Sequence, residues 1–256
     1  MPDNNFHIIA CDIGQGDAIL ITYKSFQVLT DGGPDNGKVL GCLSKYLPFW
    51  DKEIEVVILT NPDIDHYGGL ISVFKNYKVF NYFKSYVPDS TVGYRLLENV
   101  VGSSRVKVIS PHAGTRFRYG LMSLDIVYPD DSAKNNTKDV QNNDSTISLV
   151  KFGNFKALLT GDGETETSDY VGKFISLGTV NYLKVNHHGS KNGLSASLLE
   201  AVKPQIAVIS VEKNNRYGHP HKEILVLLEG ADVKYYRTDQ SGNIEVISDG
   251  KSWWMK

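Results

Sequence analysis

Four groups of aspartate and histidine residues directly follow apolar stretches of this sequence, and these residue types could bind a metal ion. The densest group is Asp63, Asp65 and His66 in TNPDIDHYGG, after the apolar run EVVILT. The other groups are Asp31, Asp162 and the pair His187-His188. Carboxylate and imidazole together suit zinc, manganese or iron, and the absence of cysteine ligands favours a catalytic site with open coordination positions over a structural one.

Each group alone has a simpler interpretation. An aspartate before glycine usually bonds the backbone of a turn, DIDH could be an ordinary helix N-cap, and the two histidines could bond to backbone carbonyls. Side chains at the ends of strands can, however, gather at one edge of a sheet, where α/β proteins place their sites. Four such groups in one chain therefore favour a metal site over four unrelated turns.

The elements that would position these groups alternate between strands and helices. Short strands broken by glycine occupy the first 33 residues, helices are expected at 37–47, 68–77, 167–177, 195–202 and 221–230, and apolar strands lie between them. A polar loop, mobile or functional, is expected at 130–145. We expect an α/β (α+β) protein: two mixed sheets packed face to face with helices outside, as one domain over 1–256.

The composition is that of an ordinary globular protein, with 41% hydrophobic and 22% charged residues and a net charge of -2. This charge gives no global attraction to nucleic acid or membranes, but the segment 184–222 holds six Lys or Arg against two Glu. Cys11 and Cys42 form no disulfide framework and are expected to be buried small apolar residues. Without a signal peptide or membrane span, a complete chain is expected to be cytoplasmic, whereas a piece of a membrane protein could be extracytoplasmic.

The motifs together resemble a known family. The sequence is similar to metallo-β-lactamase-fold hydrolases and, within them, to the soluble nuclease-like domain of ComEC-type DNA-uptake (competence) proteins. The matching stretches cover nearly the whole chain: ACDIGQGDAILI (10–21), LTDGG (29–33), LTNPDIDHYGGL (59–70), NNDSTISLV (142–150), LLTGDGE (158–164), LKVNHHGS (183–190) and NNRYGHPH (214–221). The resemblance implies a four-layer αββα metallo-β-lactamase-like sandwich.

The resemblance also implies a ligand set. The superfamily loop reads His-x-His-x-Asp-His, and ComEC-like members carry aspartate at its second place, as Asp63 does here. Asp65 and His66 would bind one metal together with His187 or His188, and Asp162 would bridge two metals. The first metal site has Asn61 in place of histidine, and would need a further ligand such as Asn143 or Asp144.

Asn61 weakens that first site, because an amide oxygen is a poorer donor than imidazole for zinc-like ions. Oxygen ligands suit Mn²⁺ or Mg²⁺ better. We therefore expect one or two divalent ions, zinc or manganese with magnesium also suitable, of which one binds tightly and the second weakly or only with substrate.

The leading hypothesis is a phosphodiesterase or nuclease that acts on single-stranded DNA or a related nucleic acid through a metal-activated hydroxide. Asp65 would orient the hydroxide and His219 would protonate the leaving alkoxide. Arg216 could grip a phosphate with two hydrogen bonds, and Tyr217 could stack on an exposed base. Further substrate donors are expected at Ser190, Lys191, Asn215 and the loop residue Asn143.

Two other hypotheses fit the same motifs. One is a metallo-hydrolase of a small ester, lactone or thioester, because one fold serves many substrates. The other is a non-catalytic domain that binds nucleic acid or a partner after losing its first metal, as Asn61 suggests. The resemblance implies a separate membrane channel as partner, and the sequence leaves the oligomeric state open.

Overall fold

The computed structural model describes residues 2–85, 87, 89–130 and 140–256, and it contains two β-sheets that pack face to face. Over these residues sheet A has eight strands, in the spatial order β15 (Trp253–Met255), β14 (Ile244–Ser248), β1 (Phe6–Ala10), β2 (Ile19–Tyr23), β3 (Phe26–Thr30), β4 (Glu53–Ile58), β5 (Lys78–Phe83) and β6 (Lys107–Ile109). Sheet B has seven strands in the same described part, in the order β13 (Lys234–Arg237), β12 (Ile206–Ile209), β11 (Tyr182–Lys184), β10 (Phe155–Leu159), β9 (Ile147–Phe152), β8 (Met122–Tyr128) and β7 (Arg116–Tyr119).

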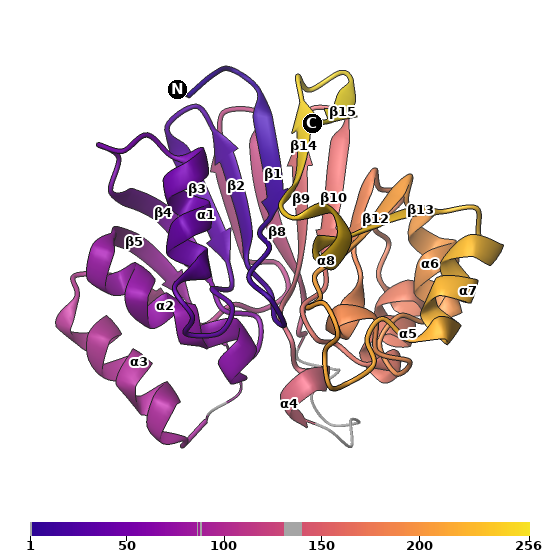
Figure 1. The fold of residues 1–256 in the computed structure, drawn as a ribbon. Coiled ribbons are helices and arrows are strands. Elements are labelled where there is room, and N and C mark those ends of the chain that lie inside the picture. The colour runs from indigo at the N-terminus through magenta and orange to yellow at the C-terminus, as the bar shows by residue number, and fades with distance from the viewer. Residues whose placement is uncertain (1, 86, 88, 131–139) are drawn as a thin grey trace.

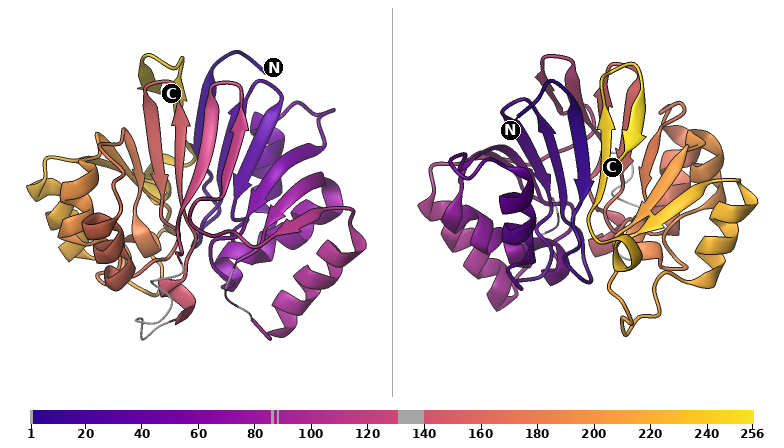
Figure 2. Two further views of the ribbon diagram at one scale, coloured as in Figure 1. Left: turned by 180° about the vertical axis from the view of Figure 1, so that it is seen from behind. Right: turned by 45° about the horizontal axis from the view of Figure 1, so that its top comes forward.

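Helices cover the outer face of each sheet (Figures 1 and 2). Sheet A is covered by α1 (Lys38–Tyr46), α2 (Ile64–Asn76) and α3 (Val92–Ser103), and sheet B by α5 (Thr165–Phe174), α6 (Ala196–Val202) and α7 (Lys222–Gly230). The short helices are α4 (Val140–Asn143), α8 (Thr238–Ser241) and the 3₁₀ turn η2 (Asn186–Gly189). The expected four-layer αββα arrangement of two mixed sheets is confirmed.

Three apolar clusters fill the spaces between these four layers. The central cluster joins the inner faces of both sheets through residues such as Ile8, Val56, Phe152 and Val208. A second cluster lies between sheet A and helices α1 to α3, and a third between sheet B and helices α5 to α7. Strands that bury both faces in this way have nearly continuous apolar sequences, such as EVVILT at 55–60 in and after β4.

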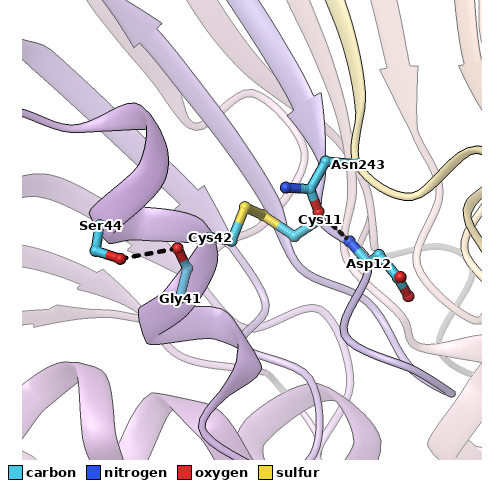
Figure 3. Close-up of a disulfide and its surroundings, with 6 residues drawn as sticks. All are labelled: Cys11, Asp12, Gly41, Cys42, Ser44 and Asn243. Atoms are coloured by element: carbon cyan, nitrogen blue, oxygen red, sulfur yellow. Dashed lines mark hydrogen bonds between the residues drawn. A yellow bond between two sulfur atoms is a disulfide. The ribbon is translucent and has the colours of Figure 1, made fainter.

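The two cysteines form a disulfide bond, so the expectation of two independent apolar residues is wrong. Cys11, just after β1, is bonded to Cys42 on α1, and both are buried (Figure 3). The sequence spacing could not reveal this pairing, because it depends on α1 packing against the end of β1. The bond ties the outer helix layer to the loop that begins at Asp12.

Most expected helices are present, with shifted ends. For example, the helix expected at 167–177 is α5 at Thr165–Phe174. The polar loop expected at 130–145 falls largely on positions 131–139, which lie outside the described residues. Among the described helices, none is long and apolar enough to cross a membrane.

Candidate metal centre

The aspartate and histidine groups meet where the strands of both sheets end. Asp31 follows β3, His66 lies in the first turns of α2 after β4, Asp162 follows β10, and His188 lies in η2 after β11. The strands β3 and β4 are parallel, as are β10, β11 and β12, so their carboxyl ends point to one edge. Contributions from sheet A and sheet B therefore converge at this edge.

Asp31 fixes the orientation of the His66 ring. Its Oδ2 lies 3.0 Å from His66 Nδ1, and both of its oxygens accept bonds from Thr60, from the backbone N–H at 2.8 Å and from the hydroxyl at 2.6 Å. A carboxylate that holds one ring nitrogen leaves the other free to bind a metal. His66 Nε2 consequently points toward Asp162, whose Oδ2 is 3.1 Å away.

The His188 ring is held by sheet B. Its Nδ1 lies 3.0 Å from the carbonyl oxygen of Ser210, which can only accept a hydrogen bond, so Nδ1 carries the proton. Nε2 then lies 3.5 Å from Asp65 Oδ2 and 3.5 Å from Asp162 Oδ1. The backbone of His188 is left-handed, with φ of 53°, as is that of His187, with φ of 46°, and non-glycine residues adopt this conformation only occasionally.

Two overlapping groups of potential ligand atoms result. One consists of Asp65, His66 and His188, and the other of Asp17, His66 and Asp162, with the atoms of each group within 4.8 Å of one another. Four buried atoms of these groups make no well-aligned hydrogen bond in the described part of the chain: Asp17 Oδ1, His66 Nε2, Asp162 Oδ1 and His188 Nε2, although His66 Nε2 lies 3.1 Å from Asp162 Oδ2. Buried polar atoms normally have partners, and a divalent cation fits this donor set.

The charges of the site support the same conclusion. Burial alone would raise the pKa of Asp162, but His66 and His188 hold that pKa well below its usual value. Burial would lower the pKa of both imidazoles, but Asp162 and Asp31 hold that of His66 well above its usual value, and Asp162 and Asp17 raise that of His188 to about 10. The carboxylates of Asp162, Asp31 and Asp17 therefore favour positive charge at these two rings, and a divalent cation bound between the rings would supply positive charge at the same place.

His187 lies farther from this centre than His188. Its Nε2 is 3.8 Å from Asp162 Oδ2, its Nδ1 is 3.8 Å from Glu164 Oε1, and its side chain is 23% exposed. The geometry thus favours His188 over His187 as the metal ligand, a choice that the sequence left open.

The side chains expected at the first metal position are engaged in other contacts. Asn61 donates from Nδ2 to Asn142 Oδ1 at 2.8 Å, and its Oδ1 accepts the backbone N–H of Asp63 at 3.0 Å. Asn143 is buried and turned toward α5, where its Oδ1 accepts the hydroxyl of Thr167 at 2.9 Å. Neither Asp63 nor Asp144 belongs to a group of three possible ligands among the described residues. Asn61 and Asn143, two of the side chains expected at this position, are thus hydrogen-bonded within the protein.

A cleft of about 290 Å³ opens directly onto the candidate metal centre. Its walls are formed by Gln15, Asp63, Ile64, Asp65, Asp162, His187, His188, Tyr217 and His219. Ile64 and Tyr217 form an exposed apolar rim, since they are 53% and 48% exposed. Tyr217 also stacks on His219, with ring centroids 5.6 Å apart.

Asn215 shapes the loop that carries this part of the wall. Its Oδ1 accepts the backbone N–H groups of Tyr217 and His219, and its Nδ2 donates to the carbonyl oxygens of Glu212 and His219. These four bonds engage the whole amide within the protein, so Asn215 supports the loop beside the cleft.

Burial and the neighbouring rings of His188 and His187 lower the pKa of His219 to about 4.

The remaining residues expected to bind substrate lie around the cleft and not in its walls. Ser190 is buried just after η2, and Lys191 is exposed next to it. Arg216 is exposed and lies over the Tyr217 ring, with its guanidinium carbon 4.9 Å from the ring centroid. The structure therefore brings Arg216 to the side of the cleft where Tyr217 lies.

Two buried charged residues of the site were missed by the sequence analysis. Asp17 and Lys184 form an ion pair with 2.6 Å between Oδ2 and Nζ, and both are buried. Lys184 was counted in the basic excess of 184–222, but a buried and paired lysine cannot attract a phosphate, so that count was too high. The available signal was Asp17 itself, an aspartate beside glycine-rich turns like those at the other strand ends.

Comparison with curated proteins shows similarity to competence proteins along almost the whole chain. The chain is 29% identical over 259 residues to ComE operon protein 3 of Bacillus subtilis, covering 91% of this chain and 32% of that protein. It is 26% identical to competence protein ComA of Neisseria gonorrhoeae, covering 96% of this chain and 33% of that protein. The chain thus spans about a third of the length of these relatives, and no family model matches it.

Solved structures with the same arrangement confirm the fold. The metallo-β-lactamase fold protein YhfI of Bacillus subtilis has a TM-score of 0.61 and 10% identity, with 98% of this chain and 100% of that chain covered. Zn²⁺-bound PqqB of Methylobacterium extorquens has a TM-score of 0.56 and 11% identity, with 91% and 97% covered. The chain therefore has the metallo-β-lactamase fold, and its sequence is similar to a third of the length of proteins named for competence.

Proposed function

We propose that this protein is a metal-dependent hydrolase that cleaves phosphodiester bonds, with single-stranded DNA as its substrate. The observation that carries the proposal is the cluster of Asp65, His66, Asp162 and His188, drawn from two overlapping candidate ligand groups, of which Asp65, Asp162 and His188 line an open cleft. Its two imidazoles and two carboxylates suit one zinc or manganese ion, and magnesium would also be accepted by the carboxylates. The similarity to competence proteins supports a nucleic acid as substrate.

A divalent ion bound at this group would lower the pKa of a water and neutralise charge that develops on the phosphoryl oxygens. Asp65 is the most exposed of the four side chains, at 28%, and it lines the cleft. Its carboxylate is placed to accept a hydrogen bond from the attacking water. His66, Asp162 and His188 are almost fully buried and have no access to substrate except through this cleft.

His219 lines the same cleft as Asp65, and in the proposed reaction it would contact the leaving oxygen. With a pKa of about 4 in the free protein, its imidazole is neutral near pH 7. A bound phosphate would raise that pKa, because its negative charge favours the imidazolium. The proposed role of His219 is therefore to donate an N–H bond to the leaving oxygen, with full proton transfer only in the substrate complex.

Tyr217 and Arg216 would bind the nucleotides next to the cleaved bond. The phenol ring is half exposed at the rim, and base stacking on such a ring tolerates any sequence. Arg216 carries an exposed positive charge at the same rim, and Lys191 is an exposed cation of the segment after η2. Asn215 would act indirectly by holding this loop. The proposed partner of the protein is a separate membrane channel that presents the DNA strand.

The experiment is cleavage of end-labelled single-stranded DNA with Mn²⁺, Zn²⁺ or Mg²⁺, beside p-nitrophenyl acetate as a small ester. Arg216→Ala is compared with Lys173→Ala, which removes a lysine from the outer helix α5. A nuclease should cleave the DNA, and its affinity for DNA should fall steeply with salt concentration. Arg216→Ala should lower the affinity for DNA more than Lys173→Ala does.

Ester hydrolysis without DNA cleavage would instead support the small-ester hypothesis. Metal binding without either activity would support a domain that only binds nucleic acid or a partner. Either result would overturn the proposed nuclease function.

A further inference from the structure

Lys184 and Asp17 form a buried ion pair directly beneath the candidate metal centre. Lys184 is 0% exposed, and its Nζ donates to Asp17 Oδ2 at 2.6 Å and to the carbonyl oxygen of Val185 at 3.0 Å. Neither residue lines the cleft. A buried ion pair contributes little net stability, because desolvation of the two charges offsets their attraction. Its presence here therefore calls for a role other than stability.

Asp17 is attached to the part of the site that comes from sheet A. Its backbone N–H donates to the carbonyl oxygen of Asp65 at 3.1 Å. The adjacent Gly16 has φ of 128°, and a Cβ there would lie 2.1 Å from the same carbonyl oxygen. The loop thus packs directly on the turn that carries Asp65, with no room for a side chain between them.

Lys184 is attached to the part of the site that comes from sheet B. It is the last residue of β11 and is followed after three residues by His188. Asp17 Oδ1 also lies 3.5 Å from His188 Nδ1, on the side of the ring opposite the metal-facing nitrogen. The pair therefore connects the backbone that carries Asp65 with the turn that carries His188.

We propose that the Asp17–Lys184 ion pair positions Asp65 and His188, which come from different sheets, as ligands of one metal ion. Lys184 is then a positioning residue that controls metal affinity without touching metal or substrate. The carboxylate of Asp17 also makes the imidazole of His188 a better donor, as acidic neighbours of metal-bound histidines do. This inference rests on the metal site of the proposed function but not on its substrate.

The test compares zinc dissociation constants, measured by competition with a chromophoric chelator, for three proteins. They are the unmodified chain, the double variant Asp17→Asn/Lys184→Met, and Leu198→Ala. The double variant removes both buried charges together, so neither is left without a partner. Leu198→Ala creates a cavity in the buried cluster between sheet B and its helices, and serves as a destabilised control with an intact site. Unfolding temperatures of the metal-free proteins are measured in parallel.

We expect the double variant to bind zinc roughly 10 to 100 times more weakly than the unmodified chain. Leu198→Ala should bind zinc as the unmodified chain does, despite its lower unfolding temperature. Equal zinc affinity in the folded double variant would overturn the proposal. Lys184→Arg is measured as well, because it keeps both buried charges and leaves Asp17, a member of one candidate ligand group, unchanged, while it alters the contact with Asp17 Oδ2. If the double variant does not fold, Lys184→Arg decides by the same two outcomes. Failure of the unmodified chain to bind zinc, manganese or magnesium would instead overturn the proposed function.

Discussion

The two sides of the candidate metal pocket differ in what their polar side chains are bonded to. On one side, His66 and His188 are each held through Nδ1, by Asp31 and Ser210, so that Nε2 faces the centre. On the other side, Asn61 is bonded through both ends of its amide, to Asn142 and to the backbone of Asp63. On the first side, the Nε2 atoms of both rings thus face the candidate metal centre, whereas on the second side the amide of Asn61 is hydrogen-bonded within the protein.

We propose that this difference reflects one retained and one closed metal position. A ligand position is lost when its residue changes, but the polar cavity must still be satisfied, because unpaired buried groups are costly. The amide network of Asn61 meets that need. We infer that one ion binds tightly and that the Asn61 side contributes to shape and not to coordination.

The largest expected effect comes from Asp162→Ala, which removes the carboxylate shared by His66 and His188. We expect metal affinity to fall by at least about a hundredfold, more than for residues that only orient ligands. Metal content of the purified variant, measured by elemental analysis, checks this. Retention of one ion per chain would show that the centre does not lie on this side.

The next largest effect is the pH dependence of metal affinity, which tests whether the ion binds on the side of His188. In the metal-free protein the pKa of His188 is raised to about 10, so near neutral pH the ring carries a proton that metal binding must displace. Apparent affinity should therefore weaken as pH falls from about 8.5 to about 6.5, by up to about tenfold per pH unit for each proton released. Zinc competition at several pH values measures it. A pH-independent affinity would mean that the ion binds without His188.

A smaller effect is expected from Asn61→His, which should reopen the closed side. The imidazole supplies a donor next to Asp63 and Asp162, so a second, weaker ion should bind and raise the metal content from one toward two per chain. Titration with zinc, followed by elemental analysis, counts the ions. A variant that still binds one ion would indicate that Asp63 is not available as a ligand.

The smallest effect is expected from Asn61→Ala. Because Asn61 bonds to Asn142 and not to the metal group, its removal should change zinc affinity by less than about twofold, while leaving buried partners unpaired and lowering stability by about 1–3 kcal/mol. Zinc competition and denaturant unfolding measure the two quantities. A large loss of zinc affinity would place Asn61 among the ligands.

The layer arrangement and the convergence of the four groups could be predicted from the sequence, because apolar runs ending in aspartate or histidine mark strand ends at one edge. The disulfide and the Asp17–Lys184 pair could not, since each joins segments that meet only after the layers pack. Cys11 reaches Cys42 only because α1 lies on sheet A, and Lys184 meets Asp17 across 167 positions. Charge counting failed at Lys184 for the same reason.

The disulfide has a practical consequence for work with this protein. It closes a segment of about 31 residues, and a cross-link of that length stabilises a fold by roughly 3–4 kcal/mol in the chain-entropy model. Complete reduction of this buried bond by a strong thiol reductant would remove the covalent link between α1 and the loop that leads to Asp17. Material produced in a reducing host should therefore be oxidised, and its free thiols counted, before any inactivity is attributed to the metal centre.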